Sequence, residues 1–463
     1  MARITKITET FFLLLVALFV SILLAPLNAW AQSHLDQVER AAALIRDNQI
    51  EEAERQLNQI LKTRPNEAAA LNLLGTIRAQ QGNLKDSEAL FARAVRIEPR
   101  MVGAHMNLAR LYLLKGTPEK AVVKLKETLR LEPGNVEASY RLAWVLLSLG
   151  RVDECVSFVE TARQSLPPSA PLLAVLGDAY MKKGSLDKAE AGYQSALNAD
   201  GANADGRMGL AMVARARGDN KTATIHLNDV RNVIVDSPDL LYKFARIALD
   251  LQLTDGALQA LRRAIELRPT EPSYYFLLGV ARLEKPDLDE GEGAFREVLK
   301  LRPDHAEGQL YLGYILLKQK KHSEAREWLE KSLRKENSAP ENLRYLGFYY
   351  LGLIAQDQND DQKAEELFEK AIRLAPSFAH AHIALGSTYL KMKDYPRARQ
   401  ALETGVKLAP GDSKAHYNLA LLYSRLNEPQ RAQEEMRIVE QLNKKGGQTA
   451  ESDLLTPPAP RPR

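Results

Sequence analysis

The sequence has only one cysteine, Cys155, among its 463 residues. A single thiol excludes a disulfide within the chain and any zinc site built from cysteines. A large excess of one charge is also missing, because the chain has 63 lysines and arginines against 59 aspartates and glutamates. The basic residues do not form a block. That balance is a poor match for a nucleic-acid-binding surface, so no nucleic-acid partner is expected.

Long hydrophobic runs are missing except at the amino terminus. There, basic residues precede an apolar run over residues 11–24, and Ala29 and Ala31 follow in a small-x-small order. This order predicts a signal peptide over residues 1–31 that is cleaved after Ala31, leaving Gln32 as the first mature residue. The mature protein is therefore expected to be exported, most simply to the periplasm.

The alternative is that the amino-terminal segment stays attached as a membrane anchor. Its apolar run ends before Pro26, and it is shorter than the ~20 residues that a spanning helix usually needs. No cysteine lies near residues 25–32, which excludes a lipidated amino terminus. Membrane contact is therefore expected only through this segment, and only if it is not cleaved.

Common enzyme motifs are missing too, including a Gly-rich phosphate loop, H-E-x-x-H and G-x-S-x-G. The nearest approach to a metal site is His380 with His382 and His416. However, His382, His416 and His105 share one position of the repeat described below, which normally holds a packing side chain. Cys155 also occupies a small packing position. The sequence therefore predicts no catalytic, cofactor-binding or metal-binding residue, and the protein is not expected to be an enzyme.

A period of 34 residues runs through the chain. Prolines mark it at Pro65, Pro99, Pro133, Pro167, Pro269 and Pro303 and, shifted by five residues, at Pro376 and Pro410. Because proline lacks the amide donor that a helix interior needs, each is expected to follow a helix end. The period defines twelve units, beginning at His34, Ala68, Val102, Val136, Ala170, Ala204, Pro238, Pro272, Ala306, Tyr345, Ala379 and Ser413.

Three positions within each unit indicate its secondary structure. Position eight is glycine or alanine in all twelve units, and position twenty is equally small, as in Ala53, Ser87 and Cys155. Position twenty-four carries a larger side chain, such as Phe91 or Tyr193. These spacings follow the helical period, so each unit is predicted to be a hairpin of two helices that approach closely at the small residues.

The turn between the two helices is predicted at position fifteen, where glycine or asparagine tolerates the left-handed conformation that ends a helix. This position holds Asn48, Gly82, Gly116, Gly150, Gly184, Gly218, Asn359 and Asn427. The ordered small, Leu, Gly, Tyr, aromatic and Pro residues resemble the tetratricopeptide repeat over residues 34–446. The resemblance implies an all-α fold, a right-handed superhelical solenoid of about twelve helix–turn–helix repeats that binds other proteins.

Some segments depart from the repeat. The unit that begins at Ala306 lacks its proline and is followed by five extra residues within 337–344, which predict a longer loop or a bend. The first unit carries Arg40 at position seven, which is leucine or phenylalanine elsewhere, as expected for a cap that meets water. Residues 447–463 are rich in proline and poor in large apolar residues, so they predict a disordered tail.

The family resemblance also implies where a partner would bind. In such arrays the first helix of each unit lines a concave groove, and positions two, five, nine and twelve face it. Aromatic and arginine side chains commonly anchor protein interfaces. The predicted partner-binding residues are Met106, Arg110, Tyr140, Trp144, Met208, Met212, Tyr242, Arg246, Phe276, Tyr314, Tyr349 and Tyr417. The alternative is that adjoining units pack over these side chains and bury them.

These observations favour a non-enzymatic scaffold or assembly factor of the cell envelope that binds other proteins or peptides. No unit pairs lysine and asparagine at positions five and nine, the carboxylate clamp of this family, so a cochaperone role is not expected. The alternative is a membrane-tethered cytoplasmic regulator with an uncleaved anchor. An enzymatic role would require a partner subunit that carries the active site.

Overall fold

The computed structural model describes residues 37–283, 288–334 and 341–445. Every regular element within these residues is a helix, which confirms the predicted all-α class. The helices form two compact units, one up to Asp219 and the other from Asn220 on. No helix in the described ranges is both long and apolar enough to cross a membrane. The predicted signal peptide (1–31) and the predicted tail (447–463) lie outside the described residues.

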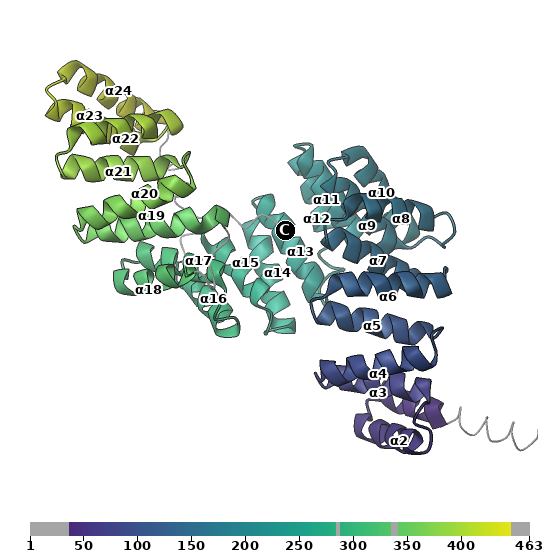
Figure 1. Ribbon diagram of the computed structural model, residues 1–463. Coiled ribbons are helices and arrows are strands. Elements are labelled where there is room, and N and C mark those ends of the chain that lie inside the picture. The colour runs from purple at the N-terminus through teal and green to yellow at the C-terminus, as the bar shows by residue number, and fades with distance from the viewer. Residues whose placement is uncertain (1–36, 284–287, 335–340, 446–463) are drawn as a thin grey trace, which may run out of the picture. The chain divides into compact units, whose positions relative to one another are not determined.

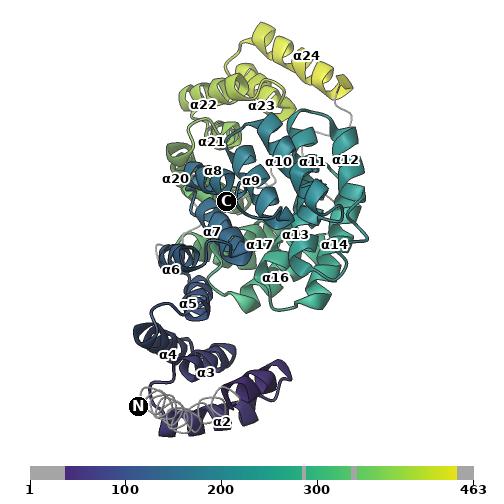
Figure 2. The ribbon, with the colours of Figure 1, turned by 90° about the vertical axis from the view of Figure 1, so that its right-hand side faces the viewer.

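The N-terminal unit is a stack of helix pairs, and partners such as α3 and α4 lie side by side in both Figure 1 and Figure 2. A helix over residues 37–46 precedes α2 (Ile50–Thr63). The following helices are α3 (Ala68–Gln80), α4 (Leu84–Ile97), α5 (Val102–Leu114), α6 (Pro118–Leu131), α7 (Val136–Ser148), α8 (Val152–Ala162), α9 (Ala170–Lys182), α10 (Leu186–Ala199) and α11 (Ala204–Ala216). From α3 on, the first helix of each pair begins at a residue where the 34-residue period begins a unit.

The C-terminal unit is itself a stack of helical hairpins (Figure 1). Its helices are α12 (Asn220–Asn228), α13 (Pro238–Asp250), α14 (Thr254–Leu267), α15 (Pro272–Leu283), α16 (Leu288–Leu301), α17 (Ala306–Lys318), α18 (His322–Ser332), α19 (Glu341–Asp357), α20 (Asp361–Leu374), α21 (Ala379–Lys391), α22 (Tyr395–Leu408), α23 (Ser413–Arg425) and α24 (Pro429–Lys445). Residues 341–344 extend α19 at its amino end, so this part of the expected loop is helical.

The two helices of a pair meet where a small residue at position eight faces a large one at position twenty-four. A Cβ atom added to Gly75 would lie 2.7 Å from the Phe91 ring, and Gly352 faces Phe368 in the same way. Ser87, at position twenty, donates its hydroxyl proton to the Gly75 carbonyl at 2.8 Å. Small side chains at positions eight and twenty therefore let the two helices pack closely enough to exclude water from the hairpin.

The predicted turns adopt the left-handed conformation. Every glycine and asparagine assigned to position fifteen has a positive φ, between 58° at Asn427 and 83° at Gly218. Three longer side chains occupy the same position, Gln252 (φ 60°), Lys320 (φ 60°) and Lys393 (φ 64°). An L-residue with a Cβ atom pays roughly 1–2 kcal/mol for this conformation. The geometry of the hairpin, rather than the local residue, therefore sets the turn.

Replacing one of these longer side chains with glycine should stabilise the C-terminal unit. We expect Gln252→Gly to raise the free energy of unfolding by about 0.5–1 kcal/mol, because relief of left-handed strain outweighs the added entropy of the unfolded chain. Denaturant unfolding followed by circular dichroism measures the change. Gly150→Ala is the matched control and should shift stability in the opposite direction. A Gln252→Gly protein that unfolds more easily than the parent would contradict the strain argument.

Successive pairs are joined by a short linker whose carbonyl is held by the next helix. A side chain at position four donates to the carbonyl six residues earlier, at position thirty-two of the preceding unit. The pairs are His105 with Pro99, Arg207 with Gly201, Tyr275 with Pro269, Gln309 with Pro303, His382 with Pro376 and His416 with Pro410, at 2.8–3.1 Å. Different side chains at one position thus donate to a linker carbonyl that has no donor within the preceding helix.

Candidate protein-binding face

Five of the twelve predicted groove residues are buried, which corrects the expectation that they face a partner. Four of them occupy position five of their units, and one occupies position nine. They are Met106, Met208, Phe276, Tyr314 and Tyr349, each at most 7% exposed. For these five residues the alternative interpretation of the sequence holds: neighbouring helices cover their side chains.

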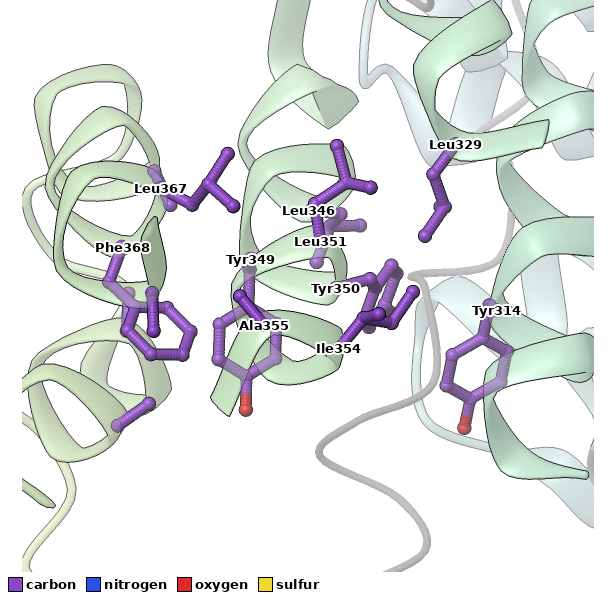
Figure 3. Packing of buried hydrophobic residues seen from close by; sticks show 14 of the residues in the cluster. Tyr314, Leu329, Leu346, Tyr349, Tyr350, Leu351, Ile354, Ala355, Leu367 and Phe368 are labelled. Carbon is purple, nitrogen blue, oxygen red and sulfur yellow. The ribbon is translucent and has the colours of Figure 1, made fainter. Parts of the chain in front are cut away.

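Figure 3 shows how the C-terminal unit buries its tyrosines. The Tyr314 ring on α17 lies 5.1 Å from the Tyr350 ring on α19, measured between centroids. Tyr349 lies 5.6 Å from Tyr350 and 5.9 Å from Phe368. Burial raises the pKa of Tyr314 to about 12. Tilted ring pairs of this kind add packing energy to the buried area, so these residues hold successive helices together.

The other predicted residues of the C-terminal unit do not gather into one patch. Tyr242 and Arg246 lie half-buried on α13, where the Arg246 guanidinium lies 6.0 Å from the Tyr242 ring centroid. The Tyr242 ring also lies 5.5 Å from the Tyr274 ring. Tyr417 is 45% exposed on α23, far from α13 along the chain. None of these residues forms part of a larger exposed cluster of predicted groove residues.

The N-terminal unit does bring predicted residues together at an exposed surface. Trp144 on α7 is 50% exposed, and Arg110 on α5 is exposed at the equivalent position nine of the preceding unit. Arg110 Nη2 donates to Glu137 Oε1 at 2.7 Å, which links α5 to α7. Tyr140 lies half-buried one turn before Trp144, and Met212 is half-buried on α11. Position nine of these first helices therefore reaches solvent.

A polar network extends this surface from α7 across α5 to α3. Arg141 donates to the same Glu137 oxygen at 2.9 Å. Arg110 Nη1 also reaches Asn107 Oδ1 at 3.5 Å, and the Asn107 amide donates to Asn72 Oδ1 at 2.9 Å. These contacts link the first helices of three successive units. We call this surface the α5–α7 face; it consists of the exposed Arg110, Leu114, Glu137 and Trp144 and the half-buried Asn107 and Arg141.

The electrostatics of the α5–α7 face favour an anionic partner group. The hydrogen bond from Arg110, reinforced by one from Arg141, lowers the pKa of the Glu137 carboxyl and keeps it ionised. Two arginines against one carboxylate leave the face with a net positive charge. Leu114, 69% exposed, and Trp144 add apolar area beside the arginines. Exposed tryptophan and arginine are the residue types that anchor protein interfaces.

Sequence reasoning named Arg110 and Trp144 on this face but missed the residues around them. Asn107 and Arg141 occupy position six, which the expected groove pattern left out. On α5, Met106 at position five is covered, whereas Asn107 at position six lies about 100° further around the helix and stays half-buried, as does Arg141 on α7. Polar side chains at position six in these two successive units, where the units before and after have Leu73 and Val175, are the signal that could have found them.

The histidines and the cysteine have structural partners. His382 and His416 each hold the carbonyl of the linker proline, as described above, and His416 also contacts Glu435 at 2.5 Å. Cys155 is fully buried and donates to the Ala143 carbonyl at 3.3 Å. Desolvation raises the pKa of the Cys155 thiol to about 11. Among the described residues, no group of three or more potential ligands is arranged to hold a metal ion.

Stacked helical hairpins with an open face of first helices define a repeat-array protein of the kind that offers an extended binding surface. Three profiles of the tetratricopeptide repeat match the chain. The first matches residues 113–170 and 355–416. The second matches residues 38–101, 175–230, 242–297 and 287–340, and the third matches residues 401–434. The chain belongs to the tetratricopeptide-repeat family. Repeats of this family generally mediate binding to other proteins and are generally non-catalytic.

Individual relatives are distant. The human protein O-mannosyl-transferase TMTC3 is 23% identical over 72% of this chain and 38% of its own length. Cellulose synthase operon protein C of Pseudomonas fluorescens is 23% identical over 70% of this chain and 30% of its own length. The chain therefore spans well under half of the length of these relatives.

Solved helical-repeat structures are similar to this chain at low identity and modest TM-score. The Cut9 and Hcn1 hetero-tetramer of APC/C matches with a TM-score of 0.45 and 15% identity, over 94% of this chain and 98% of that one. The Pseudomonas aeruginosa protein pilF matches with a TM-score of 0.40 and 20% identity, over 46% of this chain and 94% of that one. These likenesses concern the helical repeat alone.

Proposed function

We propose that this protein is a non-enzymatic scaffold or assembly factor of the cell envelope that holds a partner polypeptide on its α5–α7 face. The observation that carries the proposal is the exposed Trp144 beside two arginines that share Glu137. Hot-spot residues of this kind contribute about 2 kcal/mol or more each when a partner buries them. A partner segment with an acidic residue next to an apolar one matches this chemistry.

Export is the second part of the proposal. It is supported by the amino-terminal sequence, with its basic residues, its apolar run over residues 11–24 and its small residues at 29 and 31. The likeness to cellulose synthase operon protein C adds a relative whose name links it to polysaccharide synthesis. We therefore propose that the scaffold acts outside the cytoplasm, in assembly of envelope components.

The export proposal predicts a processed amino terminus. We expect Edman sequencing or intact-mass measurement of protein from source cells to give Gln32 as the first residue, with the protein in the soluble envelope fraction. Ala29→Leu combined with Ala31→Leu should block processing, because the cleavage site requires small side chains. Full-length protein in the membrane fraction, with its repeats protected from external protease, would instead establish the membrane-tethered cytoplasmic regulator.

A further inference from the structure

The second helix of the sixth unit is unusually short. Helix α12 ends at Asn228 after 9 residues, whereas α14 and α16 in the same compact unit each have 14. The next residues are rich in β-branched side chains, which lower helix propensity. Val230 and Ile234 of the irregular segment 229–236 are buried, and Ile234 lies beside Leu241 and Phe244 of α13.

A surface cavity of about 450 Å³ opens beside this irregular segment. Its apolar wall consists of Ile234, Leu241, Phe244 and Ala260, from the segment, α13 and α14. The volume lies within the range of pockets that hold small ligands, roughly 300–1,000 Å³. The cavity is therefore large enough to take an aromatic ring or a short aliphatic chain.

The charged side chains that line the cavity are both arginines. Among the described residues, those that line it include two arginines and two side-chain amides but no carboxylate. Arg263 is already occupied, since it pairs with Asp236 at 3.2 Å and Glu266 at 3.0 Å and donates to the Val235 carbonyl. Arg231 instead donates to the Gln259 amide oxygen at 3.0 Å and lies 6.0 Å from the Phe244 ring centroid. Both of these partners are uncharged.

We propose that this cavity binds an apolar carboxylate, with the apolar group against Leu241 and Phe244 and the carboxylate on Arg231. A guanidinium presents two parallel N–H donors that match the two oxygens of a carboxylate. The Gln259 amide lies within reach of the same group because it already contacts Arg231. The ligand is either a free arylalkyl or aliphatic acid or the carboxyl terminus of a polypeptide that ends in an apolar residue.

Gly256 keeps the cavity open. A Cβ atom added there would lie 3.8 Å from Arg231 Nη2 and 3.9 Å from the Phe244 ring, so a side chain would enter the cavity without a backbone clash. Gly256 lies in the first turn of α14 and has a negative φ. Gly256→Leu is therefore a variant that fills the cavity while the helix is retained.

The test is calorimetric titration of the full protein with 4-phenylbutyrate and with the uncharged 4-phenylbutanol. We expect one saturable site that prefers the acid by about tenfold, because a charge-assisted contact is lost in the alcohol. Arg231→Gln should abolish this preference, and Gly256→Leu should abolish binding of both probes. Arg262→Gln is the control, since Arg262 lies on α14, as Gly256 does, but pairs with Glu290 at 3.0 Å, and this variant should bind like the parent.

A second titration distinguishes the source of the carboxylate. A hexapeptide ending in phenylalanine is compared with its carboxyl-terminal amide. Binding of the peptide acid but not the amide assigns the site to a polypeptide terminus, and binding of phenylbutyrate alone assigns it to a free acid. Equal binding of acid and alcohol, a preference that survives in Arg231→Gln, or no saturable binding of any probe would each overturn the proposal.

Discussion

Gly209→Ala should destabilise the N-terminal unit by roughly 3 kcal/mol or more, although it adds a single methyl group. A Cβ atom at Gly209 on α11 would overlap the Tyr193 ring on α10. The ring has little room to move, because Gly177 on α9 also lies against it, where an added Cβ would be 2.6 Å away. The Tyr193 hydroxyl is also fixed, since it donates to Asp178 at 2.7 Å. Overpacking of a rigid site lies at the upper end of the usual 1–3 kcal/mol.

The measurement is denaturant unfolding followed by circular dichroism, with Gly103→Ala as the control. Gly103 lies on α5 in the same unit, and its added Cβ would meet only the Asn72 amide at 3.9 Å. That change should be neutral or mildly stabilising, because alanine is the better helix former. In a Tyr193→Ala background Gly209→Ala should cost nothing, which gives a large coupling energy in the double-mutant cycle. Equal effects of Gly209→Ala in both backgrounds would contradict the packing described.

The second large effect is expected on partner binding. The double variant Arg110→Ala, Trp144→Ala should raise the dissociation constant for the bound partner by about 30-fold or more, equivalent to about 2 kcal/mol. Folding should be nearly unaffected, since Trp144 is 50% exposed and the Arg110–Glu137 pair has side chains 45% and 48% exposed. Exposed ion pairs of this kind contribute little to stability.

Biolayer interferometry with the partner recovered from source cells measures this loss. The matched control is Val123→Ala, Arg130→Ala on α6, which also removes an exposed apolar side chain and an ion-paired arginine. Val123 is 62% exposed, and Arg130 pairs with Glu127 at 2.7 Å. The control should bind like the parent. If both double variants lose affinity to the same degree, the effect does not come from the α5–α7 face.

Much of the fold could be predicted because the repeat averages local signals over many units. Glycine and asparagine at position fifteen predicted the turns, and the small residues at position eight predicted the close helix contacts at Gly75 and Gly352. The turns at Gln252 and Lys320 could not be predicted from the residue type, because the hairpin imposes a conformation that those residues disfavour. The division of the helices into two compact units after Asp219 could not be predicted either, because the 34-residue period does not change there.

The candidate site was less predictable because burial depends on the neighbouring unit. Tyr349 and Tyr417 both occupy position five, yet Tyr349 is 4% exposed and Tyr417 is 45% exposed. Helix α21 follows the unit of Tyr349 and packs against α19, whereas no further described unit follows α23. A pattern of residue types on one helix does not contain this information. Charge pairing across units, as between Arg110 and Glu137, is likewise a property of the stacked array.

Photo-crosslinking in source cells tests most directly whether a partner protein binds on the α5–α7 face. p-Benzoylphenylalanine is placed at position 144 and, as the control, at position 123 on α6. We expect a discrete crosslinked protein from position 144 that is missing from position 123 and is lost when Arg110→Ala is added. The same adduct from both positions, or no adduct from position 144, would contradict the assignment of this face as the partner-binding surface.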